Sequence, residues 1–475
     1  MRGLVVATWG DPFAWREARY KLADSTHEGV TSLFALKEEL SPDRMVVLAP
    51  ETLLSPSQRS AESMKRYQGK LLKEELHGLS GQEHPEWYES LLQSLKEALL
   101  RFCEEKLKVK PEVVIMPNLG EYSGVEWIIR TEVSPDSAYA AFALLSILST
   151  ASELADGDAL RVALDTTHGI NFMPLAAYRA TLAACRVIAA AYHIKVVFEQ
   201  YNSTPYPLGA SDTPELEIFK VREEVITPMK AAQRLVYSYV SREKVHHVYF
   251  AEGFPRAEEV RGNFKWLSEI HENTGPLAAA IHYSMPLAFL QFPSEPERSD
   301  VDLMKLLSLV SIQEMGSKVR VEHLAVPKYE DFKSSLSAYA LASYGRRAAE
   351  SMGFGKGIVE ASLEQLRRVL DRYLQGPLAK VAEHELSNLG ELRDPELEEA
   401  AERSRSKREW VRVKEGCEDQ RRILVAHAGL AKKSLEIKYE GGLVLRYHQG
   451  CLDKLKEMLA QELFESTGKL VRGSM

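Results

Sequence analysis

The first 200 residues alternate short apolar runs with longer helical patterns, and this alternation restricts the fold more than any other feature of the chain. Helical periodicity is clearest at 86–108, 135–155 and 173–192. Strands alternating with helices predict an α/β domain on a parallel, doubly wound sheet. After the first apolar run, we expect a turn at Gly10 followed by a charged helix. The apolar runs, which have the length and composition of buried strands, lie at 4–7, 44–49, 112–116, 160–164 and 194–199.

The pattern changes after residue 207. One more strand is expected at 216–221, and helical periodicity then continues to the C-terminus. A chain of 475 residues is long enough for two or three domains. We also expect a hairpin near Gly441 and Gly442. The predicted units are an α/β domain at 1–222, a helical connector at 223–327 and a helical domain at 328–475.

Charge and cysteine content narrow the classes of partner. The chain has 60 Lys and Arg against 68 Asp and Glu, a net charge of −8. A polyanionic ligand must therefore bind at a local positive patch or to backbone amides. The cysteines are widely spaced with no CxxC pair, which argues against a zinc site and a disulfide framework and favours a reducing cytoplasm. We expect no metal cofactor, and no stretch long and apolar enough to cross a membrane. The four cysteines are Cys103, Cys185, Cys417 and Cys451.

Polar loops after the predicted strands are the first candidate site, because ligands of open α/β sheets bind beyond the carboxyl ends of the strands. Three such loops lie at 8–11, 117–120 and 165–171. The third places hydroxyls, an imidazole and a glycine before a long helix, whose first amides favour anions. Its alternative role is structural, with Asp165 and Thr166 capping the helix and a glycine supplying a turn. No GxGxxG motif follows the first strand and no Gly-Lys pair continues into Ser or Thr, which excludes dinucleotide and P-loop sites.

A second candidate site contains Arg421, Arg422 and His427. A neutral imidazole can take the 2′-hydroxyl proton of RNA while a guanidinium stabilises charge on the phosphate, so these groups can cleave RNA without a metal. On one straight helix, Arg422 and His427 would lie about 140° apart. Either a helix begins at this point or a second protomer completes the site. The structural alternative is a partly buried histidine beside solvated arginines.

Two segments together resemble a known family. The stretch ALDTTHGINFMP at 163–174 resembles the signature loop of the CARF domains of CRISPR-associated proteins, and RRILVAHAG at 421–429 resembles the R-x4–6-H motif of HEPN ribonucleases. Their order and separation are similar to those of the CARF–HEPN ribonucleases of type III CRISPR systems. The resemblance covers both halves of the chain, whereas the connector carries no recognised motif.

The resemblance implies a Rossmann-like CARF domain with a parallel sheet, a mostly α-helical connector and an α-helical HEPN domain. It also implies a homodimer, with further assembly left open, that cleaves single-stranded RNA when a cyclic oligoadenylate binds the paired CARF domains. The usual activator in the family is cyclic tetra-adenylate. Trp9 would stack on adenine. Carried onto this chain, the ligand would contact Thr8, Trp9, Asn118, Thr166, Thr167, His168 and Gly169.

The second motif departs from the family pattern at one position. A small polar residue usually follows the catalytic Arg of HEPN motifs, whereas Ile423 follows Arg422. Taking Arg421 as catalytic would make Arg422 the polar neighbour. We take Arg422, at the commoner spacing, together with His427.

The reaction expected from these residues is metal-independent and leaves 2′,3′-cyclic phosphate and 5′-hydroxyl ends. We assign His168 to ligand binding alone. Two other functions remain open at this level. One is a cyclic-oligoadenylate sensor that binds nucleic acid without cleaving it, and the other is a ring nuclease that degrades the messenger.

Overall fold

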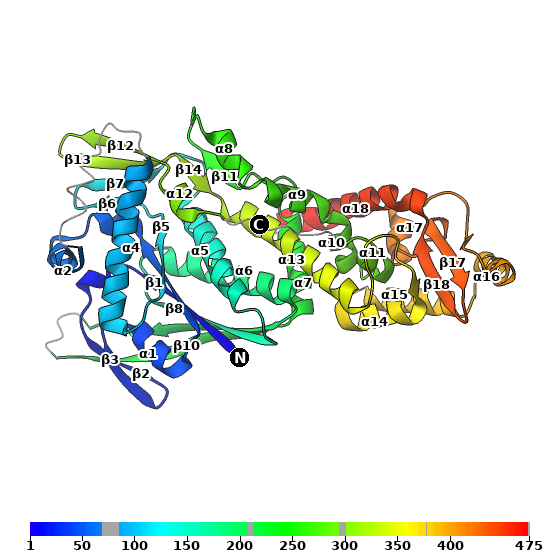
Figure 1. Cartoon of the computed structure of the whole chain (residues 1–475), viewed down its shortest axis with the longest axis horizontal. Helices are drawn as coiled ribbons and strands as arrows, with labels where there is room; N and C mark the ends of the chain where they lie inside the picture. Colours follow the sequence, from blue (N-terminus) through cyan, green and yellow to red (C-terminus); the bar gives the residue numbers. More distant parts are fainter. Residues whose placement is uncertain (69–84, 208–211, 294–300, 377, 474–475) are drawn as a thin grey trace.

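The computed structural model describes residues 1–68, 85–207, 212–293, 301–376 and 378–473. The chain is elongated, with a large sheet domain at one end and a small sheet with its helices at the other (Figure 1). A long helix, α13 (Tyr329–Ser351), runs between the two ends. A single cluster of buried side chains extends from the N-terminal strands to the C-terminal helix.

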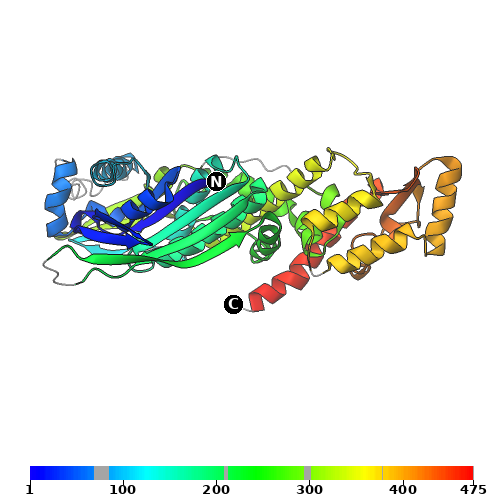
Figure 2. The same ribbon diagram turned by 90° about the horizontal axis from the view of Figure 1, so that it is seen from below.

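The N-terminal domain is built on an eight-stranded sheet with the order β3-β2-β10-β9-β8-β1-β4-β5. Figure 2 shows its strands side by side in one twisted layer. Neighbouring strands from β9 to β5 are all parallel, which confirms the predicted parallel sheet for this part. Strands of this kind are covered on both faces and therefore need continuous apolar runs. The parallel strands are β1 (Arg2–Trp9), β4 (Arg44–Pro50), β5 (Glu112–Met116), β8 (Ala159–His168) and β9 (Lys195–Ser203).

The other three strands make the sheet mixed, which the sequence did not predict. The strand β10 (Glu215–Ile226) is antiparallel to β9, and β2 (Ala18–Leu22) pairs with β10 and with β3 (Ser25–Gly29). The charged helix expected after Gly10 was therefore wrong. Burial of Ala18 and Tyr20, two residues apart, gives this charged segment the period of a strand.

Helices cover both faces of the sheet. Right-handed crossovers place α1 (Ser32–Leu40), α2 (Gln58–Gln68) and α4 (Pro85–Leu107) on one face and α5 (Pro135–Glu153) and α6 (Met173–Tyr192) on the other. Alanines fill the contact between α5 and α6 and allow close packing. In the described part of the chain, no helix combines the length and apolar character needed to span a membrane. Short 3-10 turns lie at Pro12–Ala14 and Glu51–Leu54.

The segment after β10 is mostly helical but returns to the N-terminal domain through strands. Its hairpin of β12 (Val310–Met315) and β13 (Lys318–His323) joins β7 (Val125–Ile129) and β6 (Gly120–Tyr122), with β13 parallel to β7. A further pair is β11 (Val248–Phe250) with β14 (Ala325–Pro327). These strands were missed because they are short and partly polar. The helices are α7 (Pro228–Val240), α8 (Ala257–Gly262), α9 (Lys265–Asn273), α10 (Gly275–His282), α11 (Pro286–Gln291) and α12 (Leu303–Leu307).

The C-terminal part is also mostly helical, as predicted. It adds a four-stranded sheet with the order β15-β18-β17-β16, whose central hairpin turns at Gly441 and confirms that prediction. The strands are β15 (Ala361–Ser362), β16 (Val411–Arg412), β17 (Leu435–Tyr439) and β18 (Leu443–Tyr447), and 3-10 turns lie at Lys432–Ser434 and Gln449–Cys451. The helices after α13 are α14 (Leu363–Tyr373), α15 (Ala379–Gly390), α16 (Pro395–Lys407), α17 (Arg421–Ala426) and α18 (Leu452–Gly473).

Candidate functional site

The carboxyl end of β8 carries the polar residues of the 165–171 segment. The strand continues to His168, so Thr166, Thr167 and His168 lie on the strand and not in a loop as predicted. The buried Asp165 carboxylate accepts hydrogen bonds from the Ser32 hydroxyl at 2.6 Å and from the Thr167 amide at 3.0 Å. These bonds connect the end of β8 to the first turn of α1.

His168 is held as a neutral imidazole at this edge. Its Nε2 atom accepts a hydrogen bond from the Ser32 amide at 3.3 Å and lies 3.4 Å from the Tyr20 hydroxyl. Its ring lies 4.1 Å from the ring of Trp15. Burial lowers the pKa of His168 to about 4, and the nearby charge of Asp165 opposes this shift only in part. The proton of the neutral ring is therefore on Nδ1.

A cavity of about 720 Å³ lies beside His168, between the end of β8 and the segment that follows β9. The Thr167 hydroxyl is buried and has no hydrogen-bond partner among the described residues. Aromatic rings can stack on bases and a guanidinium can bind phosphate, so this lining suits a nucleotide. Its polar and aromatic lining includes Trp15, Arg16, Thr167, His168, Asn202 and Tyr206.

Gly169 allows the end of β1 to approach the start of α6. A Cβ atom at this position would lie 2.5 Å from Thr8 Oγ1 and 2.6 Å from Pro174 Cγ. Thr8 is buried, and its hydroxyl lies 3.4 Å from the Asp165 carbonyl oxygen, to which it donates. The capping alternative does not describe this segment, because α6 begins at Met173 and its N-cap residue Phe172 makes no side-chain cap.

Only Thr167 and His168 of the seven predicted ligand residues line the cavity, and the other five, which include Trp9 and Asn118, do not. Trp9 is 0% exposed and packs edge-on against Trp15 at 5.1 Å and Phe102 at 6.0 Å, so no face is open for the predicted stacking on adenine. Trp15, which sequence reasoning missed, is the tryptophan that lines the cavity. Asn118 follows β5, which β1 and β4 separate from β8.

The second motif forms the short helix α17, which begins at Arg421 and ends just before His427. Of the two alternatives considered, the start of a helix at this point is therefore observed within one chain. Arg421 Nη1 lies 2.8 Å from a Glu465 carboxylate oxygen, and its Nε lies 3.9 Å from Glu462, both on α18. Arg422 is exposed and has no ion pair within the described part of the chain.

His427 lies at the C-terminal end of α17 with 47% of its side chain exposed. Its Nδ1 atom is 3.0 Å from a carboxylate oxygen of Glu385 on α15. The Nε2 atom on the other side of the ring is thereby left for a substrate. The segment thus carries a carboxylate-bound imidazole and an exposed arginine that has no ion pair among the described residues.

Comparisons with known proteins place the N-terminal domain in a family. Residues 4–205 match the family model described as the CARF domain of the CRISPR system endoribonuclease Csx1. The N-terminal domain is a CARF domain. A curated relative, the CRISPR system endoribonuclease Csx1 of Methanocaldococcus jannaschii, is 22% identical over 446 residues, which cover 92% of this chain and 87% of the relative. The predicted resemblance to the CARF–HEPN ribonucleases of CRISPR systems is confirmed by these two matches.

A comparison of folds aligns the whole chain with the whole of one solved structure. That structure is Enterococcus italicus Csm6 bound to cyclic hexa-2′-fluoro-hexa-dAMP, with 8% identity and a TM-score of 0.25. A score of this size supports no conclusion about fold or ligand.

A buried polar network connects the CARF domain to the segment before α13. The Glu51 carboxylate, 0% exposed, lies 2.7 Å from His323 Nε2 of β13. It also accepts hydrogen bonds from the Tyr88 hydroxyl at 2.6 Å and from the backbone amide of Asn118 at 3.1 Å. Burial and the adjacent carboxylate raise the pKa of Tyr88. The backbone amide of Asn118 is therefore part of a buried hydrogen-bond network, which gives this residue a structural position in the CARF domain.

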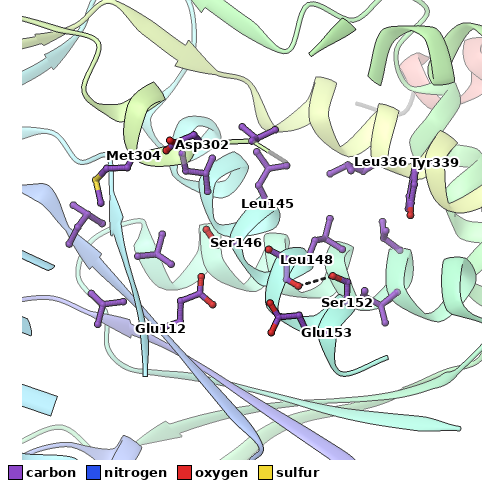
Figure 3. Close-up of a pocket in the computed structure, with 18 of the residues that line it drawn as sticks. Glu112, Leu145, Ser146, Leu148, Ser152, Glu153, Asp302, Met304, Leu336 and Tyr339 are labelled. Carbon is purple, nitrogen blue, oxygen red and sulfur yellow. Dashed lines mark hydrogen bonds between the residues drawn. The ribbon is translucent and has the colours of Figure 1, made fainter. Parts of the chain in front are cut away.

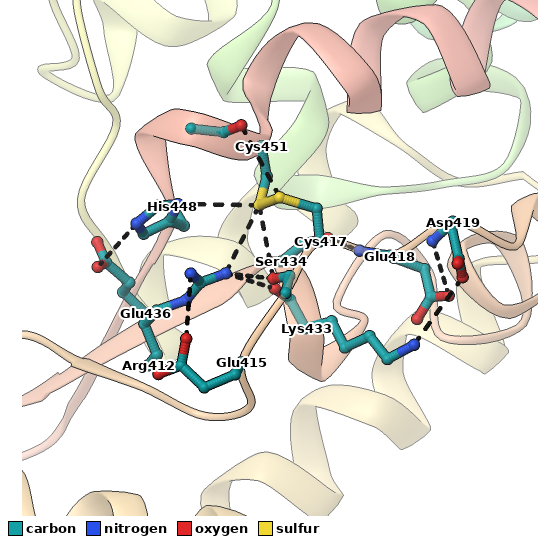
Figure 4. The surroundings of a disulfide bond; sticks show 12 residues. Arg412, Glu415, Cys417, Glu418, Asp419, Lys433, Ser434, Glu436, His448 and Cys451 are labelled. Atoms are coloured by element: carbon teal, nitrogen blue, oxygen red, sulfur yellow. Dashed lines mark hydrogen bonds and ion pairs between the residues drawn. A yellow bond between two sulfur atoms is a disulfide. The ribbon is translucent and has the colours of Figure 1, made fainter.

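A disulfide bond joins Cys417 and Cys451, so the prediction of no disulfide was wrong for this pair. The two Cα atoms lie 5.5 Å apart, although 34 residues separate them in sequence. Around the bond, Arg412 donates to the Lys433 carbonyl oxygen at 3.2 Å and lies 3.8 Å from Cys451 Sγ (Figure 4). The bond links the segment before α17 to the start of α18. Cys103 and Cys185 are free and buried.

A second cavity, of about 630 Å³, lies between the CARF domain and α12 and α13 (Figure 3). Its carboxylate Glu112 accepts a hydrogen bond from Thr150 at 2.6 Å. The hydroxyls of Ser146 and Ser152 donate to backbone oxygens of their own helix. These three groups have hydrogen-bond partners within the protein. The buried indole N–H of Trp266, which also lines the cavity, has none among the described residues. The described residues contain no group of three or more His, Cys, Asp or Glu side chains placed to hold a metal ion.

Proposed function

We propose that this protein is a HEPN-type endonuclease for single-stranded RNA in CRISPR antiviral defence, activated when a cyclic oligoadenylate binds its CARF domain. The observation that carries this proposal is the carboxylate-bound imidazole of His427, which directly follows the short helix that holds the exposed Arg422. The match of both halves to a Csx1 endoribonuclease supports it. The activator we propose is cyclic tetra-adenylate, and the working form is a homodimer.

The side chains suit cleavage by the RNA's own 2′-oxygen. His427 Nε2 takes the 2′-hydroxyl proton as the 2′-oxygen forms a bond to phosphorus. Arg422 stabilises the added negative charge on the phosphate. The bond between phosphorus and the 5′-oxygen then breaks. The 5′-oxygen receives a proton from an imidazolium, the protonated form of a histidine side chain. The products are a 2′,3′-cyclic phosphate and a 5′-hydroxyl. No step of this reaction uses a metal ion.

The difference in ion pairing between Arg421 and Arg422 supports Arg422 as the catalytic arginine. The charge of Arg421 is paired with Glu465, which fixes α17 against α18. A carboxylate this close cancels part of the electrostatic attraction between the guanidinium and a phosphate. Arg422 has no such carboxylate partner among the described residues and is exposed to an incoming RNA.

The cavity beside His168 is the ligand site we propose in each CARF domain. Thr167 and His168 face the ligand directly, and Thr8, Thr166 and Gly169 shape the strand ends behind it. Trp15 takes the stacking role first assigned to Trp9. Activation requires that the ligand bind the cleavage-competent dimer more tightly than the resting one.

The test is cleavage of end-labelled single-stranded RNA in EDTA, with and without cyclic tetra-adenylate. We expect cleavage that depends on the ligand, is lost in His427→Ala and Arg422→Ala, and yields cyclic phosphate ends. RNA with 2′-deoxy sugars should resist cleavage. Ligand binding without RNA cleavage would favour a sensor that regulates other proteins. Loss of the cyclic ligand itself, unaffected by His427→Ala, would favour a ring nuclease.

A further inference from the structure

One carboxylate outside the recognised motifs contacts the candidate catalytic imidazole. Glu385 Oε2 lies 3.0 Å from His427 Nδ1, although 42 positions separate the two residues in sequence. The Glu385 side chain is 19% exposed, whereas that of His427 is 47% exposed. The contact thus lies on the inner side of the imidazole and leaves the outer side open.

Packing of α15 fixes the direction of the Glu385 side chain. Ala382, Leu386 and Leu389 are buried on this helix, and Glu385 lies beside them at the edge of the packed face. Glu383, on the same helix, is exposed. A side chain on a packed helix is held more accurately than one on a loop. A group that orients another side chain needs such a fixed position.

An ionised carboxylate can only accept hydrogen bonds, so the proton of the neutral imidazole must be on Nδ1. The Nε2 atom then presents a lone pair, which is the form that can remove a proton from a 2′-hydroxyl. The carboxylate also stabilises the imidazolium that forms once the proton has moved. A partly exposed contact of this kind adds little to folding stability.

We propose that Glu385 is a positioning residue that holds His427 in the Nδ1-protonated tautomer and orients Nε2 toward the RNA 2′-hydroxyl. This role rests on the proposed ribonuclease function. Glu385 does not contact the substrate; it acts through His427.

The experiment compares Glu385→Ala, Glu385→Gln and the matched control Glu383→Gln at saturating cyclic tetra-adenylate. We expect kcat for RNA cleavage to fall about 100-fold or more in Glu385→Ala, with KM nearly unchanged, because the contact matters in the transition state. The Gln side chain can still accept the Nδ1 hydrogen bond, so Glu385→Gln should retain part of the rate. The control should cleave like the wild type.

A spectroscopic measurement separates positioning from a loss of structure. Nitrogen NMR of histidine-labelled protein, assigned with His427→Ala, should show the Nδ1-protonated form of His427 in the wild type and a mixture of tautomers in Glu385→Ala. An unchanged tautomer, or a kcat within about twofold of wild type, would overturn the role of Glu385. His427→Ala would then still be inactive and the proposed function would stand. A wild-type protein that cleaves no RNA under any of these conditions would overturn both.

Discussion

Breaking the Cys417–Cys451 disulfide should weaken the C-terminal part and slow RNA cleavage, with little effect on ligand binding. The bond closes a loop across a sequence separation of 34 residues. For a loop of this length, the chain-entropy relation gives about 4 kcal/mol of stabilisation at 25 °C. For a domain of the size of residues 328–475, this corresponds to a fall in Tm of about 10 °C.

The effect on cleavage follows from what the closed loop contains. It includes α17 with Arg422 and His427, and the hairpin of β17 and β18. The bond also links the segment before α17 to the start of α18, which carries the partners of Arg421. Greater freedom of α17 would lengthen the contact of His427 with Glu385. The CARF cavity lies at the other end of the molecule and should keep its affinity.

The assay combines thermal unfolding, RNA cleavage and ligand titration on oxidised protein, reduced protein and a Cys417→Ser/Cys451→Ser double variant. Thiol titration of denatured protein should find the two free cysteines before reduction and all four afterwards. The double variant should resemble the reduced wild type and show no further response to reductant. An unchanged Tm after confirmed reduction would refute the entropy argument. A reductant effect that persists in the double variant would refute the assignment to this bond.

Three further predictions test the two candidate sites. Arg422→Ala should lower kcat by about 100-fold or more, whereas Arg421→Ala should chiefly lower Tm, and equal kcat losses would contradict the division of roles. Gly169→Ala should weaken cyclic tetra-adenylate binding, measured by calorimetry, because its Cβ would lie 2.5 Å from Thr8 Oγ1. The pKa of His168 is about 4 in the folded protein, against 6.5 for an ordinary histidine. Above pH 6.5 the side chain is neutral in both the folded and the unfolded chain. Below pH 6.5 the unfolded chain takes up a proton, so the free energy of unfolding declines. This decline is about 1 kcal/mol at pH 5.5, and His168→Gln should make denaturant unfolding less sensitive to pH between 6.5 and 4.

Local patterns predicted the parallel part of the CARF sheet well. Buried parallel strands require apolar residues at every position, so their runs stand out in the sequence. The hairpin of β2 and β3 was missed because it lies at the edge of the sheet, where Arg19 and Lys21 alternate with buried residues. Charged residues on one face of a strand, as in β2 next to the edge strand β3, are easily taken for a solvated helix. The hairpin of β12 and β13 escaped for a related reason, since its exposed residues include Gln313 and Glu314.

The ligand site was predicted in part, because its strand ends follow directly from the strands. The segment from Asp165 to His168 lies where an α/β sheet binds its ligands. Both Trp9 and Trp15 pack against Phe102 of α4, but only Trp9 is fully buried, and no pattern near residue 9 in the sequence shows this difference. Burial of Trp9 and exposure of Trp15 to the cavity could therefore be learned only from the folded chain.

Several contacts of the fold and of the proposed active site join residues far apart in sequence, and this explains why the motifs alone were incomplete. Glu385 meets His427, Cys417 meets Cys451, and Glu51 meets His323 across 272 positions. Periodicity shows which face of an element is buried, but it does not show which element covers that face. A histidine next to an arginine in sequence is thus only a candidate. The carboxylate that fixes its tautomer, and the carboxylates that neutralise one of two adjacent arginines, decide which groups are free to act on a phosphate.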